Sequence, residues 1–174
     1  ADLIVGLPSD TREDVRRGFT MLVNAGIHEL QVGMLKRLRG TAIAGDLGQG
    51  IRFSETPPYE VLETPEFSAE DIAWFKRFAR YCDLYYNKGN FPTSLPLLWE
   101  TAETPYNVFA GLVDYVWERE QKTHQIPLVR LAEHLYRYLV KQEHHDPEHI
   151  AETIESDFRR IKGRRDNLEL KIDN

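Results

Sequence analysis

The densest group of side chains that could do chemistry in this 174-residue chain is a set of three histidines near its end. His144, His145 and His149 lie among acidic residues, and imidazole with carboxylate is a ligand set that zinc accepts. His145 and His149 are four residues apart, but Pro147 begins a helix between them and breaks their common helical face. No second ligand group accompanies them. The pattern therefore favours a polar junction between two helices over a metal site.

The only cysteine limits metal and redox chemistry. Cys82 excludes a disulfide within the chain and any zinc or iron–sulfur site built from this chain's thiolates alone. It falls in the apolar stripe of a predicted helix, whereas a nucleophilic cysteine needs an accessible, electropositive niche. We interpret it as a packing residue. No apolar run approaches the roughly 20 residues of a membrane helix, so the expected location is cytoplasmic, with no membrane partner.

Charge makes a nucleic-acid partner unlikely. The chain carries 22 basic and 28 acidic residues, a formal charge of −6. Nonspecific nucleic-acid binding needs clustered Lys and Arg. Two short basic groups exist, and each has a solvated, structural interpretation that we favour over anion or RNA binding. They are Lys36, Arg37 and Arg39, and then Arg159, Arg160, Lys162, Arg164 and Arg165.

Two strands and a helix open the chain. Residues 2–6 and 29–35 have the composition of strands, and residues 11–25 have apolar residues at helical spacing behind a Thr11–Asp14 capping box. Strand, helix and strand in this order predict a parallel pair. A parallel sheet is covered on both faces and needs neighbouring strands, so we expect the chain to be the C-terminal piece of a longer protein.

The remainder is predicted to be loop and then helix. Residues 36–50 are glycine-rich, with one short helix near 42–47, and short strands flank Pro57-Pro58 at 52–54 and 59–63. Helices follow from Ser68, which forms a predicted capping box with Asp71, and from Pro105, Pro127 and Pro147. The change of pattern predicts a domain boundary near residue 50, which separates domains 1–50 and 51–174. The excess of acidic residues falls entirely within the second of these domains.

Three segments carry a family resemblance. Residues 2–11 read DLIVGLPSDT, residues 29–41 read ELQVGMLKRLRGT, and residues 57–62 read PPYEVL. Together they resemble the C-terminal region of cobalamin-binding-type radical S-adenosylmethionine (SAM) enzymes, in which an uncharacterised helical domain follows the barrel. The resemblance implies an α/β fragment, the last strands and helix of a partial TIM barrel, followed by a mostly α-helical C-terminal domain.

The resemblance also implies cofactors and site residues. The intact protein would use SAM, a four-iron four-sulfur cluster and, in this group, cobalamin. This chain alone would hold none of them, because it lacks the three-cysteine cluster motif. Asp2 would bond the ribose of SAM, Ile4 and Gly6 would pack against its adenine, and Leu35 and Lys36 would offer backbone groups to the adenine edge.

No catalytic residue and no metal ligand can be assigned within these 174 residues. The expected partners are the remainder of the same protein and an unidentified substrate. The helical domain would cap the barrel mouth and exclude water. The alternative is a noncatalytic module that docks a protein or nucleic-acid partner.

Overall fold

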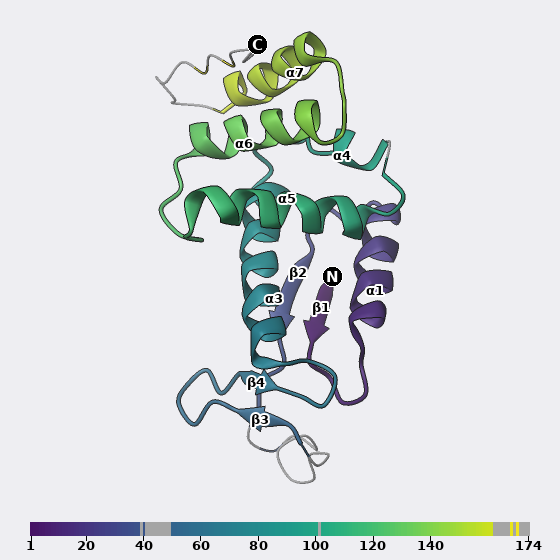
Figure 1. Ribbon diagram of the computed structural model, residues 1–174, viewed down its shortest axis with the longest axis vertical. Coiled ribbons are helices and arrows are strands. Elements are labelled where there is room, and N and C mark those ends of the chain that lie inside the picture. Colours follow the sequence, from purple (N-terminus) through teal and green to yellow (C-terminus); the bar gives the residue numbers. More distant parts are fainter. Residues whose placement is uncertain (39, 41–49, 101, 162–167, 169, 171–174) are drawn as a thin grey trace. The chain divides into compact units, whose positions relative to one another are not determined.

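The computed structural model describes residues 1–38, 40, 50–100, 102–161, 168 and 170, and it forms two compact units, Ala1–Cys82 and Asp83–Asn174. Figure 1 labels their main elements. The first unit contains β1 (Asp2–Val5), α1 (Arg12–Asn24), β2 (Gln31–Met34), β3 (Arg52–Phe53), β4 (Val61–Glu63) and α3 (Ala69–Cys82). The second contains a π-helical turn η1 (Asp83–Asn87), α4 (Leu97–Glu100), α5 (Pro105–Glu120), α6 (Leu128–Lys141) and α7 (Pro147–Arg159).

The first unit confirms the predicted strand–helix–strand order. β1 and β2 pair in parallel, with Asp2 opposite Gln31 and Val5 opposite Met34. The capping box at Thr11 forms as predicted and satisfies free N–H groups at the start of α1. A small α/β unit followed by helices is therefore confirmed. The described residues place two strands in this sheet and show no barrel.

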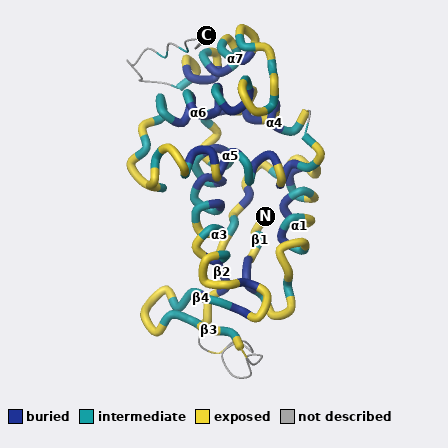
Figure 2. The backbone as a smooth tube through the Cα atoms, in the orientation of Figure 1, coloured by how far each residue is buried: buried dark blue, intermediate teal, exposed yellow. Residues whose placement is uncertain are grey.

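The two faces of the β1–β2 pair differ sharply. Side chains alternate along a strand, so residues paired in register share a face. One face packs under helices: a Cβ atom added to Gly18 of α1 would lie 2.9 Å from Leu3 Cδ1, and α3 packs against β2. The other face is mostly exposed (Figure 2), and its members are Asp2, Ile4, Gln31 and Gly33.

One layer of helix covers the packed face. The rings of Phe19 in α1 and Phe78 in α3 meet edge to face, with 5.0 Å between their centroids. An Arg12–Asp71 ion pair also joins these two helices. Cys82, at the end of α3, is buried and contacts the carbonyl oxygen of Leu30 at 3.6 Å, as expected of a packing residue.

The β3–β4 hairpin forms a separate two-stranded sheet next to the end of β2. The N–H of Val61 donates to the carbonyl of Leu35 at 2.8 Å, and the N–H of Arg37 donates to the carbonyl of Tyr59 at 3.0 Å. This pairing ties the hairpin to the end of β2. The domain boundary predicted near residue 50 lies within the first compact unit of the structure, which extends to Cys82.

The second unit is helical, as predicted. Side chains of Thr104 and Asp146 cap α5 and α7, and each of these helices has proline in its first turn. Pro127 precedes α6 but provides no side-chain hydrogen bond. The core is built from aliphatic and aromatic side chains, among them Leu112 and Leu135. The short helix predicted near 42–47 lies outside the described residues.

Among the residues that the structure describes, no helix has both the length and the apolar character that a membrane crossing requires.

A buried carboxylate joins α7 to the segment that precedes α4. Asp157 is 1% exposed and accepts hydrogen bonds from the N–H of Thr93 at 3.0 Å, the N–H of Ser94 at 2.8 Å and the hydroxyl of Ser94 at 2.8 Å. Three donors on one buried carboxylate make it a fixed point of the helical unit.

We predict that Asp157→Ala lowers the free energy of unfolding by about 3 kcal/mol, because it leaves buried donors without an acceptor. Chemical denaturation monitored by circular dichroism measures this. The matched control is Glu155→Gln, which removes an exposed ion pair with Arg159 and should change stability by less than about 0.5 kcal/mol. Equal effects of the two substitutions would contradict the assignment.

Candidate functional site

The predicted cofactor-binding residues fall into two groups along the β1–β2 pair. Gly6, Leu35 and Lys36 lie at the carboxyl ends of the strands, where parallel α/β folds place their ligands. Asp2 lies at the opposite end, paired with Gln31. Gly6 follows Asp2 by four positions, a distance of about 13 Å along a strand. Asp2 and Ile4 lie on the same open face, but Asp2 and Lys36 lie at opposite ends of the strand pair.

Backbone groups at the end of β2 are not equally available. The N–H of Leu35 donates to the carbonyl of Val5 at 2.9 Å, and the carbonyl of Leu35 accepts from Val61. The carbonyl of Lys36 accepts from Leu38 at 3.1 Å. The N–H of Lys36 has no partner among the described residues, and its side chain is exposed. Of the two residues predicted to offer a backbone donor, only Lys36 has one to offer.

On the open face, some positions have free space beside the backbone and others do not. A Cβ atom added to Gly6 would lie 3.0 Å from Val61 Cγ1, so the side chain of Val61 occupies the space beside Gly6. A Cβ atom added to Gly33 would meet nothing within 4 Å. Ile4 is 42% exposed. Room for a ligand ring therefore exists beside Ile4 and Gly33 rather than at Gly6.

The residues that the structure describes contain no group of three or more His, Cys, Asp or Glu side chains that could hold a metal ion. In the histidine-rich segment, the carboxylate of Asp146 accepts from the N–H of His149 at 2.8 Å as the cap of α7. The segment connects α6 to α7. Its polar residues cap a helix there, which agrees with the helix-junction interpretation.

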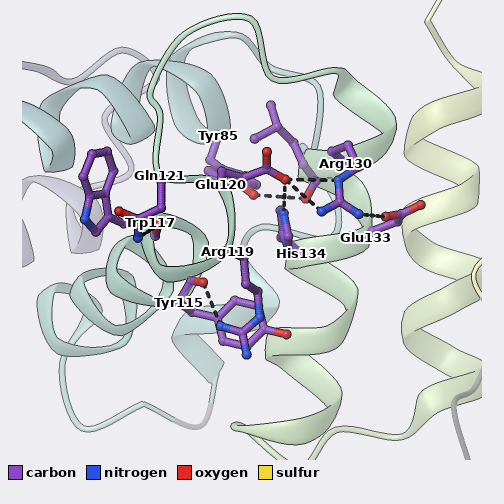
Figure 3. Close-up of polar contacts among 10 residues, drawn as sticks. Tyr85, Tyr115, Trp117, Arg119, Glu120, Gln121, Arg130, Glu133 and His134 are labelled. Carbon is purple, nitrogen blue, oxygen red and sulfur yellow. Dashed lines mark hydrogen bonds and ion pairs between the residues drawn. The ribbon is translucent and has the colours of Figure 1, made fainter.

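The second unit contains a buried polar cluster that the sequence did not reveal (Figure 3). Oε1 of Glu120, at the end of α5, lies 2.7 Å from Nε2 of His134 in α6. The same oxygen lies 3.0 Å from a guanidinium nitrogen of Arg130. Arg130 also bonds Glu133 at 2.9 Å. The side chains of His134 and Glu120 are only 1% and 8% exposed. We call Glu120, Arg130 and His134 the Glu120 cluster.

Hydrogen bonding sets the charge state of the cluster. The hydrogen bond from His134, with further help from Arg130, lowers the pKa of Glu120 despite its burial. Burial is the largest influence on His134 and lowers its pKa, while the hydrogen bond to Glu120 opposes this shift. A carboxylate only accepts hydrogen bonds. The arrangement at neutral pH is therefore an ionised Glu120 that accepts from a neutral His134.

Aromatic rings enclose the cluster. The ring of Tyr115 meets His134 edge to face, with 6.2 Å between centroids. The guanidinium of Arg119 lies 3.5 Å from the centroid of the Tyr115 ring on the same helix. The hydroxyl of Tyr85 donates to the carbonyl of Leu131 in the first turn of α6. The side chains of His134 and Glu120 are largely buried, so their hydrogen bond is stronger than it would be at a surface.

One signal in the sequence could have indicated this cluster. His134 lies between Leu131 and Tyr138 on the apolar stripe of α6, where a polar side chain requires a partner. Glu120 at the C-terminal end of α5 is unfavourable for the helix dipole and calls for a compensating positive group or donor. Pattern alone does not show that the two residues meet across the turn.

The fold thus combines a small α/β unit, open on one face, with a helical unit stabilised by buried polar contacts. Residues 49–170 match the family described as protein of unknown function (DUF4080), and the chain belongs to that family. The match begins close to the boundary predicted near residue 50, and it contains both the Glu120 cluster and Asp157. No curated protein and no solved structure matches the chain.

We predict that Glu120→Ala destabilises the chain by about 2–3 kcal/mol, because it leaves the ring N–H of His134 buried without an acceptor. Thermal or denaturant unfolding at pH 7 measures the loss. Glu118→Ala is the matched control two residues earlier, since Glu118 is exposed and its ion pair with Arg119 is long at 3.5 Å. The assignment would be wrong if both variants unfolded like the wild type.

Proposed function

We propose that this chain is the C-terminal part of a radical SAM enzyme, and that the open face of β1–β2 lines the cavity for SAM. The observation that supports the proposal is that the two faces of the parallel strand pair are not equally buried. Helices cover one face, and the other presents Ile4, Gly33 and polar side chains to solvent. Parallel sheets are covered on both faces, so the exposed face needs a further occupant.

The end of β2 has the donor that an adenine edge requires. Adenine presents ring-nitrogen acceptors, and the N–H of Lys36 lies at the strand end without another partner among the residues described. On the open face, Gly33 and Ile4 leave space for a flat ring, and Gly33 lies three residues before this donor along the chain. The ribose role that the resemblance implies for Asp2 requires a ligand that extends along the open face toward the start of β1.

The described residues do not fit a four-iron cluster, because Cys82 is buried against Leu30 and lies in no multi-ligand group. In the proposal, the cluster ligands and any cobalamin site belong to the remainder of the protein. When bound, these groups supply reductive cleavage of SAM and the radical chemistry or group transfer that follows. The second unit acts as a helical cap.

We predict that Lys36→Pro weakens SAM binding about tenfold, because proline removes the one backbone donor assigned to the adenine edge. Lys36→Ala removes the ammonium but keeps the N–H, and it should bind SAM like the wild type. The assay is SAM affinity and 5′-deoxyadenosine release by the full-length protein that contains this chain, purified anaerobically and reduced. Absence of 5′-deoxyadenosine from the wild type would refute the proposed function.

A second substitution tests the proposed cavity without lowering the stability of the chain. Gly33→Val places a β-branched side chain into open space on a strand, so stability should stay the same or rise slightly. The same side chain would fill the proposed cavity and reduce 5′-deoxyadenosine release at least tenfold. Met21→Gln, at a 71% exposed position of α1, is the control and should change neither property. Full activity in Gly33→Val would contradict the cavity.

A further inference from the structure

We propose that the α5–α6 junction of the second unit is an acid-sensitive latch, which a neutral His134 holds closed and which opens when His134 takes up a proton. This proposal does not depend on the proposed enzyme function. It uses only the Glu120 cluster and the start of α6.

The closed state requires one tautomer of His134. Its Nε2 lies 2.7 Å from a carboxylate oxygen of Glu120, so Nε2 carries the hydrogen. Its Nδ1 is buried and has no hydrogen-bond partner among the described residues. A second proton would have to go to Nδ1, where the new N–H would meet no acceptor. A buried donor without an acceptor disfavours the closed state.

The charges that face His134 act in opposite directions: the two guanidinium groups disfavour a second ring proton, as burial does, whereas the carboxylate favours it. From α5 they are the carboxylate of Glu120 and the guanidinium of Arg119, and from α6 the guanidinium of Arg130. Tyr115 presents its ring to His134 from α5. No charged group of α7 is among the influences on His134 in the described part of the chain. Protonation would place a second cation beside Arg130 on the same carboxylate.

The start of α6 depends on this cluster. α1, α5 and α7 each begin with a side-chain cap, whereas Pro127 gives α6 none. Arg130 and His134, in the first two turns of α6, are both held by Glu120. Loss of the His134–Glu120 bond leaves the Arg130–Glu120 contact and the Tyr85–Leu131 hydrogen bond to hold the start of α6, and therefore loosens the turn between α5 and α6.

The direction of the pH effect follows from burial. The pKa of His134 is lowered in the closed state, so the open state binds more protons below the ordinary histidine value near 6.5. The opening equilibrium should rise by up to about tenfold for each pH unit below that value, until the closed-state pKa is reached. Above pH 7 it should be independent of pH.

Two measurements on the whole chain test the latch. Nitrogen-15 NMR of the histidine rings should show a neutral His134 with hydrogen on Nε2 at pH 7 and a pKa below 6.5. Hydrogen exchange, corrected for the intrinsic rate, should show that protection of amides 131–134, which donate to carbonyl groups of residues 127–130, falls between pH 6.5 and 5. A His134 pKa at or above 6.5, or hydrogen on Nδ1, would overturn the proposal.

Substitutions test whether the pH dependence comes from the side chain of His134. His134→Gln keeps a neutral donor that can reach Glu120 but cannot be protonated, so protection of amides 131–134 should no longer depend on pH between 6.5 and 5. His149→Gln, at an exposed histidine of α7, should keep the wild-type pH dependence. The same pH dependence in His134→Gln and wild type would refute the latch. Should His134→Gln fail to fold, the ring titration of the wild type decides.

Discussion

The constraint on which the first unit depends is the hydrogen-bond ladder between β1 and β2. Once these strands pair in parallel and in register, alternation assigns every side chain to one of two faces. Leu3 and Val5 go under α1 and α3, and Ile4 and Gly33 go to the other side. The same ladder uses the N–H of Leu35, and the β3–β4 hairpin then uses its carbonyl, which leaves the N–H of Lys36 as the available donor. The open face on which we place the proposed ligand is thus a consequence of strand register.

The second unit depends on buried polar contacts as much as on its apolar core. Asp157 accepts three hydrogen bonds from the segment before α4, and Glu120 accepts from two side chains of α6. Apolar packing of helices tolerates small shifts and rotations, whereas a buried carboxylate with several donors is satisfied in one arrangement only. Both contacts lie within the segment that matches the family. They define the relative placement of α4, α5, α6 and α7 within this unit.

Local signals in the sequence predicted the elements well, and contacts between distant residues account for what they missed. The capping pairs Thr11–Asp14 and Ser68–Asp71 span three residues each, and both form as predicted. The docking of Val61 on Leu35 joins residues far apart in sequence, so the boundary predicted near residue 50 did not anticipate a first unit that extends to Cys82. The Glu120–His134 contact joins two helices across a turn. The spacing of apolar residues does not predict the geometry of that turn. For the candidate site, the family resemblance indicated the strand ends, while the difference between Leu35 and Lys36 required the actual pairing.

The central claim is that the open face of β1–β2 is a wall of a nucleoside-binding cavity. Backbone amide shifts of the full-length protein that contains this chain, labelled with nitrogen-15 and followed during titration with S-adenosylhomocysteine, test it most directly. We predict perturbations at Lys36, Gly33 and Ile4, with the amides of α5–α7 unmoved. Saturating nucleoside that leaves these three amides unchanged, or that moves residues elsewhere instead, would contradict the account.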